Sequence, residues 1–485
     1  MKRKWPLISG LVLLAVAAAS FALLSPKRLE PVNTASARFE PRQIERGEYL
    51  ARVGDCTACH TAPGGAAFAG GLVMQTPIGA IYSTNITPDP ETGIGDYSFE
   101  AFERALRHGI AREGHTLYPA MPYPSYARVS ESNLRDLYAY FMRGVAPVRQ
   151  ANRDSDIPWP LSMRWPLSIW RGLFAPKAAD FVPRPGQDAV VARGAYLVEG
   201  LGHCGACHTP RALTMQEKAL TSADGARYLS GSVPLESWVA KSLRGDHRTG
   251  IGSWSEAELA QFLRTGRNEH NAVFGSMTGV VEHSLQYLDA GDATAIARYL
   301  KTLPANDPGD APFRYDGQVG HALWQGDDGR RGAAVYIDNC AACHRTDGRG
   351  YATVFPALAG SATLNSDDPT SLIHIVLRGG TLPATRHAPS TITMPGFGWR
   401  LDDRQIADVV TFIRGSWGNG GHPVAEDAVR KVRRATANAA SEDVAAGSGR
   451  RLIPPGRNRG ADCSICPPER RTCSRNPCRL RNGNR

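Results

Sequence analysis

The chain has 485 residues, of which 42% are hydrophobic and 21% charged, and its mean hydropathy is −0.30. This composition is that of an ordinary globular protein and excludes a polytopic membrane protein. The net charge is +10, but residues 425–485 alone carry 14 Lys and Arg against 6 Asp and Glu. The rest of the chain is therefore nearly neutral and lacks the basic stripe of a nucleic-acid-binding protein.

The first 25 residues predict export. A basic start at residues 2–4 precedes an apolar run at residues 5–24 that contains several small side chains. This pattern is typical of a secretory signal peptide, and the run is also long enough to serve as an uncleaved membrane anchor. We therefore expect residues 1–25 to be a signal peptide or an N-terminal anchor, and the bulk of the chain to lie outside the cytoplasm.

A cysteine motif recurs along the chain. The pattern Cys-x-x-Cys-His occurs at three places, which are Cys56/Cys59/His60, Cys204/Cys207/His208 and Cys340/Cys343/His344. A redox dithiol would follow a strand and leave the histidine without a role, whereas a zinc site would need four ligands. Covalent haem attachment uses all three side chains, because the thiols bond the vinyl groups and the histidine ligates iron. We therefore predict three covalently bound haem c groups.

Each motif belongs to a longer repeat. Arg-Gly at residues 46, 193 and 331 opens a short helical pattern that leads into the motif. A second helical pattern ends in Leu-Arg-x-Gly at residues 106–109, 263–266 and 377–380, where the glycine suits a C-cap. A loop with a methionine follows, and then a final amphipathic helix that carries Tyr140, Tyr299 or Phe412 in matching places.

The recurring methionines are candidates for the sixth iron ligand. A thioether is a soft, neutral donor that raises the potential of haem iron, although methionine more generally serves as core filler. Met74 and Met142 fit the repeat less well, and no histidine outside the motifs recurs at one slot. The predicted axial pairs are His60 with Met121, His208 with Met277, and His344 with Met394.

An arginine also recurs, at Arg107, Arg264 and Arg378. It would suit a buried haem propionate, which needs a cationic partner. The alternative is an exposed cation at a helix C-terminus, favoured by the helix dipole. We favour the exposed helix-end cation.

An aromatic segment, residues 157–176, lies between the first two repeats. Three tryptophans and a phenylalanine alternate there with Arg164 and Arg171. Such a segment suits a membrane interface, a partner surface or a quinone pocket, and it would equally serve as a clamp between two domains.

The C-terminal tail breaks the pattern. Residues 435–485 are rich in arginine and cysteine and lack apolar periodicity, so we expect them to be disordered. Cys463 and Cys466 have no following histidine, which excludes a fourth haem motif. A four-cysteine zinc site is one alternative, and a frameshifted end is the explanation that we favour.

Long runs of the sequence resemble the triheme cytochrome c subunits of membrane-bound periplasmic dehydrogenases, as in gluconate 2-dehydrogenase and quinoprotein alcohol dehydrogenase. The resemblance covers residues 42–419 and is carried by such runs as TPIGAIYSTNITPDPETGIGDYSFEAFERALRHGI, GLGHCGACHTPRALTMQEKAL and PTSLIHIVLRGGTLPATRHAPSTITMPGFGWRL. It implies a mainly α fold of three tandem class I-like cytochrome c domains with long loops. The expected domains are residues 42–148, 188–303 and 318–417, with residues 149–187 as an aromatic linker.

The resemblance also implies the function. The chain would be no enzyme on its own and would have no catalytic residue. It would pass electrons from a large FAD or PQQ subunit, sometimes with a small third subunit, to ubiquinone at the periplasmic face of the cytoplasmic membrane. The third repeat resembles the gluconate type somewhat more than the alcohol type. An electron donor to a terminal oxidase and a self-sufficient haem oxidoreductase are the alternatives.

Overall fold

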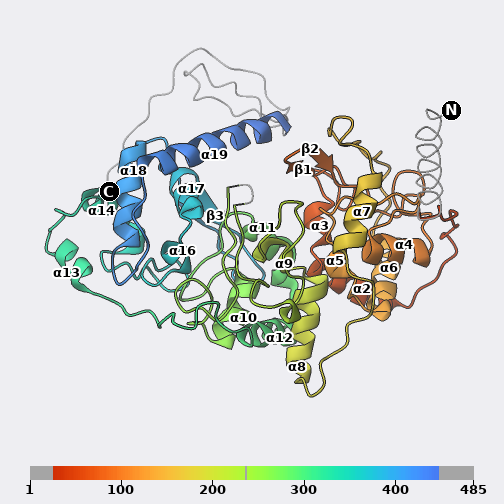
Figure 1. Cartoon of the computed structure of the whole chain (residues 1–485), viewed down its shortest axis with the longest axis horizontal. Coiled ribbons are helices and arrows are strands. Elements are labelled where there is room, and N and C mark those ends of the chain that lie inside the picture. The colour runs from red at the N-terminus through yellow and green to blue at the C-terminus, as the bar shows by residue number, and fades with distance from the viewer. Residues whose placement is uncertain (1–25, 235–236, 447–485) are drawn as a thin grey trace, which may run out of the picture. The chain divides into compact units, whose positions relative to one another are not determined.

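The computed structural model describes residues 26–234 and 237–446 (Figure 1). The described chain is mainly helical, with two small antiparallel sheets of two strands each. Residues up to Ala440 belong to one compact unit, to which all contacts below refer. The predicted signal peptide or anchor and tail residues 447–485 lie outside the described residues. Within the described ranges, no helix is long and apolar enough to cross a membrane.

The first part of the chain forms the helices expected around the first motif. Ser98 and Ser130 cap the N-termini of two of them, and Gly109 ends the first of these two in the left-handed conformation. The elements are α2 (Pro41–Val53), α3 (Cys56–Cys59), β1 (Val73–Thr76), β2 (Gly79–Tyr82), α4 (Phe99–His108), α5 (Tyr123–Tyr126), α6 (Glu131–Arg143) and α7 (Trp165–Phe174).

The middle part again places helices before and after its motif, with one irregularity. The helix that approaches the second motif continues into a wider π-type turn, where Gly200 has non-helical dihedral angles. The elements are α8 (Ala189–Tyr196), η1 (Leu197–Leu201), α9 (Gly205–His208), η2 (Ser222–Asp224), α10 (Glu256–Thr265), α11 (Met277–His283), η3 (Leu285–Tyr287) and α12 (Ala290–Lys301).

The last part again places one helix before the motif and another at the end of the repeat. The elements are α13 (Gln318–Trp324), α14 (Ala333–Asn339), α15 (Ala341–His344), α16 (Ala362–Asn365), α17 (Thr370–Arg378), β3 (Gly379–Leu382), β4 (Ile392–Pro395), α18 (Asp403–Arg414) and α19 (Glu426–Ala446).

The same helix crossing occurs three times, between α2 and α6, α8 and α12, and α14 and α18. The glycine of each Arg-Gly pair lies at the crossing. A Cβ on Gly47, Gly194 or Gly332 would stand 2.0–2.3 Å from a backbone oxygen of the final helix. The preceding arginine then pairs with an aspartate of that helix, as Arg46 does with Asp136 at 2.8 Å. Arg-Gly therefore combines a close helix approach with an ion pair.

Buried side chains form two main cores. One contains residues from Leu50 to Leu303, and the other residues from Leu323 to Val432. The first two predicted domains thus share one hydrophobic cluster instead of having a core each. A Cβ on Gly54, just before the first motif, would stand 3.1 Å from Leu201, just before the second, so the motif-bearing segments of the first two predicted domains meet within this shared cluster.

Two expectations are corrected. The methionines were all expected in loops, but Met277 begins α11 and Met394 lies in β4. Disorder was expected from residue 435, but α19 continues to Ala446. The start of α19 docks on the second core through buried Val429 and Val432, and buried Thr436 accepts a hydrogen bond from Arg378 Nε at 3.0 Å. The reading from composition overlooked this helical spacing.

Candidate haem sites

Each Cys-x-x-Cys-His motif forms a single helical turn directly after a longer helix. The three turns are α3, α9 and α15. Their first cysteines are half-buried, whereas Cys59 and Cys207 are exposed. Both thiols of each motif therefore lie on the short turn that also carries the histidine, as covalent attachment to one ring requires.

The ionisation of the thiols argues against a redox dithiol. Burial raises the pKa of Cys56, Cys204 and Cys340 to about 12. A reactive dithiol needs a lowered thiol pKa, because the thiolate is the nucleophile. A zinc site is not supported either. Nowhere in residues 26–234 and 237–446 do three His, Cys, Asp or Glu side chains gather so as to hold a metal ion.

Each motif histidine makes the same type of hydrogen bond, between its Nδ1 and a backbone carbonyl. His60 Nδ1 lies 2.7 Å from the carbonyl oxygen of Thr84. The corresponding distances are 2.7 Å from His208 Nδ1 to the Lys241 carbonyl and 2.9 Å from His344 Nδ1 to the Pro356 carbonyl. A carbonyl can only accept, so Nδ1 carries the proton and the lone pair resides on Nε2. Burial lowers the pKa of all three histidines. Each ring is therefore held neutral and oriented, with the Nε2 lone pair available to a metal.

The third site is a pocket that holds the predicted ligand pair. Cys340, Cys343, His344 and Met394 all line it, and the other lining side chains are mostly apolar. Its space is about 1260 Å³, counting the open mouth. The donor set and the apolar wall fit a haem. When bound, haem iron supplies one-electron chemistry.

The predicted methionines of the other two sites are half-buried. Met121 packs against the first core, and Met277 against a small cluster of Val273, Val281 and Leu382. Their roles as iron ligands stay predictions.

Several buried polar atoms near the motifs have no hydrogen-bond partner among the described residues. Three of them are donors, namely the hydroxyls of Tyr228 and Thr363 and the ammonium of Lys241, whose pKa burial lowers to about 8. Thr363 lines the third pocket, and the Lys241 carbonyl binds His208. Buried donors without partners are rare in native proteins, and the carboxylates of a haem would satisfy such groups.

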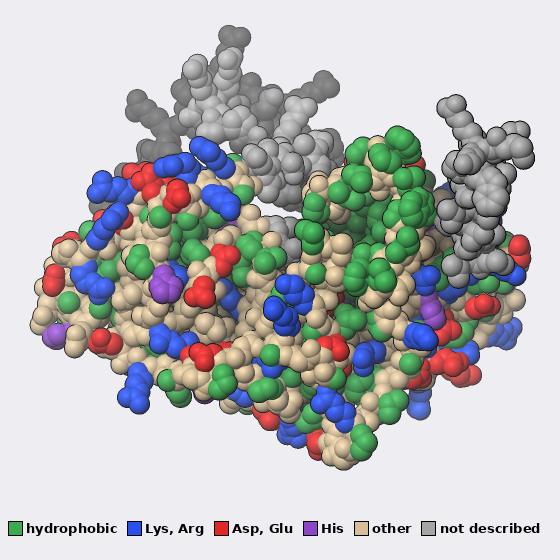
Figure 2. Space-filling model, in the orientation of Figure 1, with side chains coloured by type: hydrophobic (Ala, Val, Ile, Leu, Met, Phe, Trp, Pro, Cys, Tyr) green, Lys and Arg blue, Asp and Glu red, His purple; other side chains and the backbone are tan. Residues whose placement is uncertain are grey.

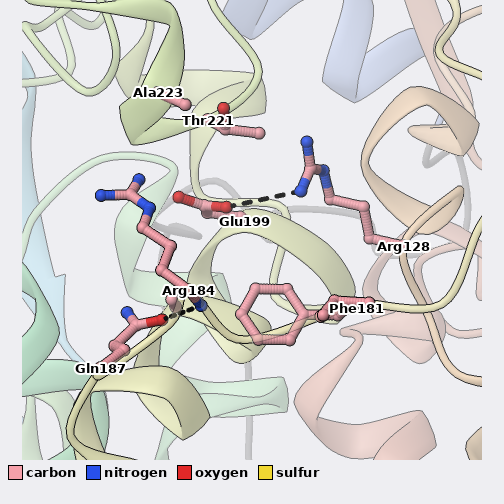
Figure 3. A pocket seen from close by; sticks show the side chains of 9 residues that line it. Arg128, Phe181, Arg184, Gln187, Glu199, Thr221 and Ala223 are labelled. Atoms are coloured by element: carbon pink, nitrogen blue, oxygen red, sulfur yellow. Dashed lines mark hydrogen bonds and ion pairs between the residues drawn. The ribbon is translucent and has the colours of Figure 1, made fainter.

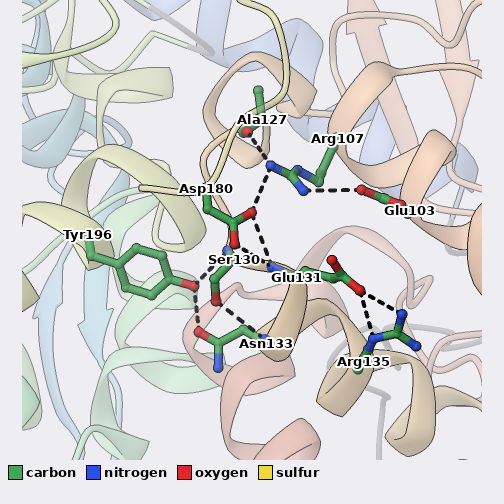
Figure 4. A network of polar contacts seen from close by, with 9 residues as sticks. All are labelled: Glu103, Arg107, Ala127, Ser130, Glu131, Asn133, Arg135, Asp180 and Tyr196. Atoms are coloured by element: carbon green, nitrogen blue, oxygen red, sulfur yellow. Dashed lines mark hydrogen bonds and ion pairs between the residues drawn. The ribbon is translucent and has the colours of Figure 1, made fainter. Parts of the chain in front are cut away.

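The recurring arginines do not share one environment. Arg107 is buried between Glu103 and Asp180, at 3.1 Å from each, and is not the exposed cation that we expected (Figure 4). Arg264 contacts His387, and Arg378 contacts Thr436. Asp180 also accepts a hydrogen bond from the backbone nitrogen of Glu131 at the start of α6. Because Asp180 supplies an opposite charge, the Arg107 guanidinium can be buried. The sequence held no signal for this linker aspartate.

A second polar cluster lies where the linker meets η1 (Figure 3). The carboxylate of Glu199 is buried and accepts hydrogen bonds from Ser222 and from Tyr299 of α12. Arg128 approaches it at 3.8 Å. Sequence analysis did not single out Glu199, which precedes Cys204 by five residues in an apolar run. These contacts hold η1, the segment that leads into the second motif, in place.

The three sites are in contact through the chain. His203 Nε2 lies 3.3 Å from the Gly54 carbonyl, and Ser284 Oγ, after α11, donates to the Val53 carbonyl at 3.1 Å, so the segment before motif one touches two parts of the second repeat. Residues 271–274, which belong with the second motif, line the third pocket. Near them, the Trp238 ring stacks on His374 of α17 with centroids 3.7 Å apart. The second site is therefore in contact with both others.

Comparisons with known proteins agree with this geometry. Residues 329–417 match the cytochrome c family model. The gluconate 2-dehydrogenase cytochrome c subunit of Pantoea cypripedii is 65% identical over 381 residues, which cover 78% of this chain and 86% of the relative. The alcohol dehydrogenase (quinone) cytochrome c subunit of Gluconacetobacter polyoxogenes is 52% identical over 403 residues, 83% of this chain and 85% of the relative.

A more distant relative is the fructose dehydrogenase cytochrome subunit of Gluconobacter japonicus. It is 38% identical over 426 residues, which cover 84% of this chain and 86% of the relative. Such identity over most of both chains exceeds what a shared haem motif alone produces. The chain therefore belongs to the family of dehydrogenase cytochrome c subunits.

Proposed function

We propose that this chain is the triheme electron-transfer subunit of a membrane-bound dehydrogenase of the gluconate type. As a cytochrome subunit it is an electron-transfer component and not the catalytic subunit. Three tandem cytochrome c domains would each hold one haem c. The covalent attachment residues are Cys56, Cys59, Cys204, Cys207, Cys340 and Cys343, and the axial ligands are His60, Met121, His208, Met277, His344 and Met394.

The chain's own groups prepare each site for this role. The carbonyls of Thr84, Lys241 and Pro356 fix the histidine rings and leave Nε2 free to ligate. Burial keeps the rings neutral, which a nitrogen ligand must be. The apolar wall of the third pocket excludes water and so favours the less charged, reduced state of the metal.

The contact between successive sites carries the relay proposal. The approach to the second motif touches the approach to the first, and residues 271–274 line the third pocket. An electron that enters at any of the three sites therefore reaches the others through contacts within one chain. A single-site haem enzyme would have no use for this continuity.

The relatives support a proposal for the type of catalytic partner. The 65% identity to a gluconate 2-dehydrogenase subunit against 52% to an alcohol dehydrogenase subunit favours a partner that oxidises gluconate or a related sugar acid. We propose an FAD-containing large subunit, a small third subunit and ubiquinone as acceptor. The complex would lie at the periplasmic face of the cytoplasmic membrane, with residues 1–25 as the export signal.

The haem count tests this proposal. The protein is produced with its own export signal in a host that matures c-type cytochromes, and its intact mass is measured. Three haem additions per chain are expected. A Cys340→Ala/Cys343→Ala variant should retain two, whereas the tail variant Cys473→Ala should keep three. Fewer than three haems in the wild type would contradict the triheme assignment.

A further inference from the structure

Helix α7 presents an unusually apolar outer side. None of its residues is buried. Trp165, Ile169 and Leu173 stand one turn apart on one face and are all exposed, Leu173 by 71%. The segment before the helix adds Trp159, which is 81% exposed, together with Leu161 and Met163. Figure 2 shows hydrophobic side chains gathered over α7.

A loop from the second site extends this surface. Trp170 Nε1 donates to the Thr214 carbonyl at 2.8 Å, which holds residues 213–215 beside α7. Leu213 is 98% exposed, and Met215 is exposed as well. We call the whole set the α7 surface, which comprises Trp159, Leu161, Met163, Trp165, Ile169, Leu173, Leu213 and Met215.

The inner side of α7 is firmly attached to the first site. The hydroxyls of Ser168 and Thr116 lie 2.9 Å apart, and the ring of Trp170 meets that of Tyr123 edge-on. The Arg164 guanidinium lies 3.9 Å from the centre of the Tyr118 ring. These contacts flank Met121. The inner side thus packs on the first repeat, and it holds the apolar side outward.

The charges around the α7 surface fit an anionic lipid surface. Residues 157–179 contain Arg164, Arg171 and Lys177 and no acidic residue. Tryptophans and leucines on one side of a short helix, with cations beside them, are typical of helices that lie in a membrane interface. A protein partner would instead require about one hydrogen bond per 100–200 Å². The hydroxyl of Ser168, one of two on the segment from Leu161 to Phe174, is already engaged with Thr116.

We propose that the α7 surface lies in the interface of a phospholipid bilayer, with anionic headgroups against Arg171 and Lys177. The inference rests on the proposed function, because that function places the complex at a membrane. It adds which face of the chain meets the lipid. It also places the segment around Met121 directly behind the membrane-facing side chains.

Vesicle binding by the full-length haem protein tests the proposal. The vesicles contain phosphatidylethanolamine and phosphatidylglycerol, and phosphatidylcholine vesicles serve as the comparison. The variant Trp159→Ser/Ile169→Gln/Leu173→Gln should bind at least ~100-fold more weakly, since each large side chain contributes roughly tenfold or more. The control Trp324→Gln/Trp399→Ser removes two side chains that are 80% and 85% exposed elsewhere, and it should bind like the wild type.

A second measurement is independent of any contribution from the N-terminus. Vesicles that contain a diazirine-bearing phosphatidylglycerol are irradiated with the wild type, and the labelled peptides are mapped by mass spectrometry. Label is expected in residues 157–176 and 211–217 and not around Trp324 or Trp399. Absence of label from both expected peptides would overturn the proposal.

Failure of the lipid proposal and failure of the proposed function give different results. Vesicle binding that persists in the α7 variant while the catalytic subunit no longer co-purifies would assign the surface to that partner and overturn the lipid proposal. Failure of the proposed function would appear differently, as haems that no dehydrogenase substrate reduces in the wild type and the variants alike.

Discussion

Single residues set the chemistry of each site through partners that stand far away in the chain. The carbonyls that orient the motif histidines lie 24, 33 and 12 residues downstream. The histidines themselves are predictable from the motif, but these partners are not. A carbonyl carries no side-chain identity, and the three spacings differ.

The assignment of Met394 leads to a residue-scale prediction. In Met394→Ala the third iron loses its sixth ligand, so the reduced protein should bind carbon monoxide at one haem. The potential of that haem should fall by on the order of 100 mV, within the range of about 0.8 V that axial ligands span. Absorption spectroscopy under carbon monoxide and a redox titration measure both. Met74→Leu is the control, and unchanged spectra in Met394→Ala would remove Met394 as a ligand.

Asp292 links the first two repeats and makes stability depend on pH. Burial alone raises its pKa, but hydrogen bonds from Arg193 and Tyr49 and the charge of Arg193 lower the pKa below 3.8. A carboxyl with a lowered folded-state pKa contributes stability that is present above the unfolded value and lost as the pH falls through the folded value. Wild-type stability should therefore decrease below about pH 3.8.

The variant Asp292→Ala should lose about 2 kcal/mol of unfolding free energy at neutral pH, because half-exposed Arg193 and the Tyr49 hydroxyl lose their charged hydrogen-bond acceptor. It should also lose less additional stability than the wild type below pH 3.8. Urea unfolding at several pH values measures both effects. Asp338→Ala, at an exposed position of α14, is the control. Equal stability of the Asp292 and Asp338 variants would refute the link.

At the scale of elements, the crossing of paired helices explains the Arg-Gly repeat. The sequence shows that the repeat recurs and that helices surround it. It does not show why glycine is needed, because the reason is the backbone of a helix about 75 to 100 residues away. The start of α19 was overlooked for a similar reason, since its few apolar residues gain meaning only against the second core.

A matched glycine pair tests the crossing. Gly332 and Gly326 have nearly equal φ angles of 87° and 84°, but an added Cβ meets the Asp408 oxygen at 2.3 Å only at Gly332. Both alanine variants share the cost of positive φ, and Gly332→Ala alone adds a steric clash. It should be less stable than Gly326→Ala by about 2 kcal/mol, the usual cost of overpacking. Thermal unfolding measures the difference, and equal melting temperatures would exclude a tight crossing.

At the scale of the whole molecule, the described chain combines a repeated plan with a shared core. Repeats, motifs and fold class were evident from the sequence because each rests on local spacing. That residues from Leu50 to Leu303 form one cluster was not evident, because contacts such as that of Gly54 with Leu201 join segments that lie far apart in the chain. This union brings the first two sites into contact, as a relay needs.

The most direct test of the account is substrate-driven reduction of the native complex. The tagged chain is purified gently from membranes with whatever large subunit accompanies it, and that subunit's cofactor is identified. We predict a flavin, reduction of three haems per chain on addition of gluconate, and their reoxidation by a ubiquinone analogue. A partner without dehydrogenase activity, or haems that stay oxidised with every sugar acid and alcohol tested, would contradict the central claim.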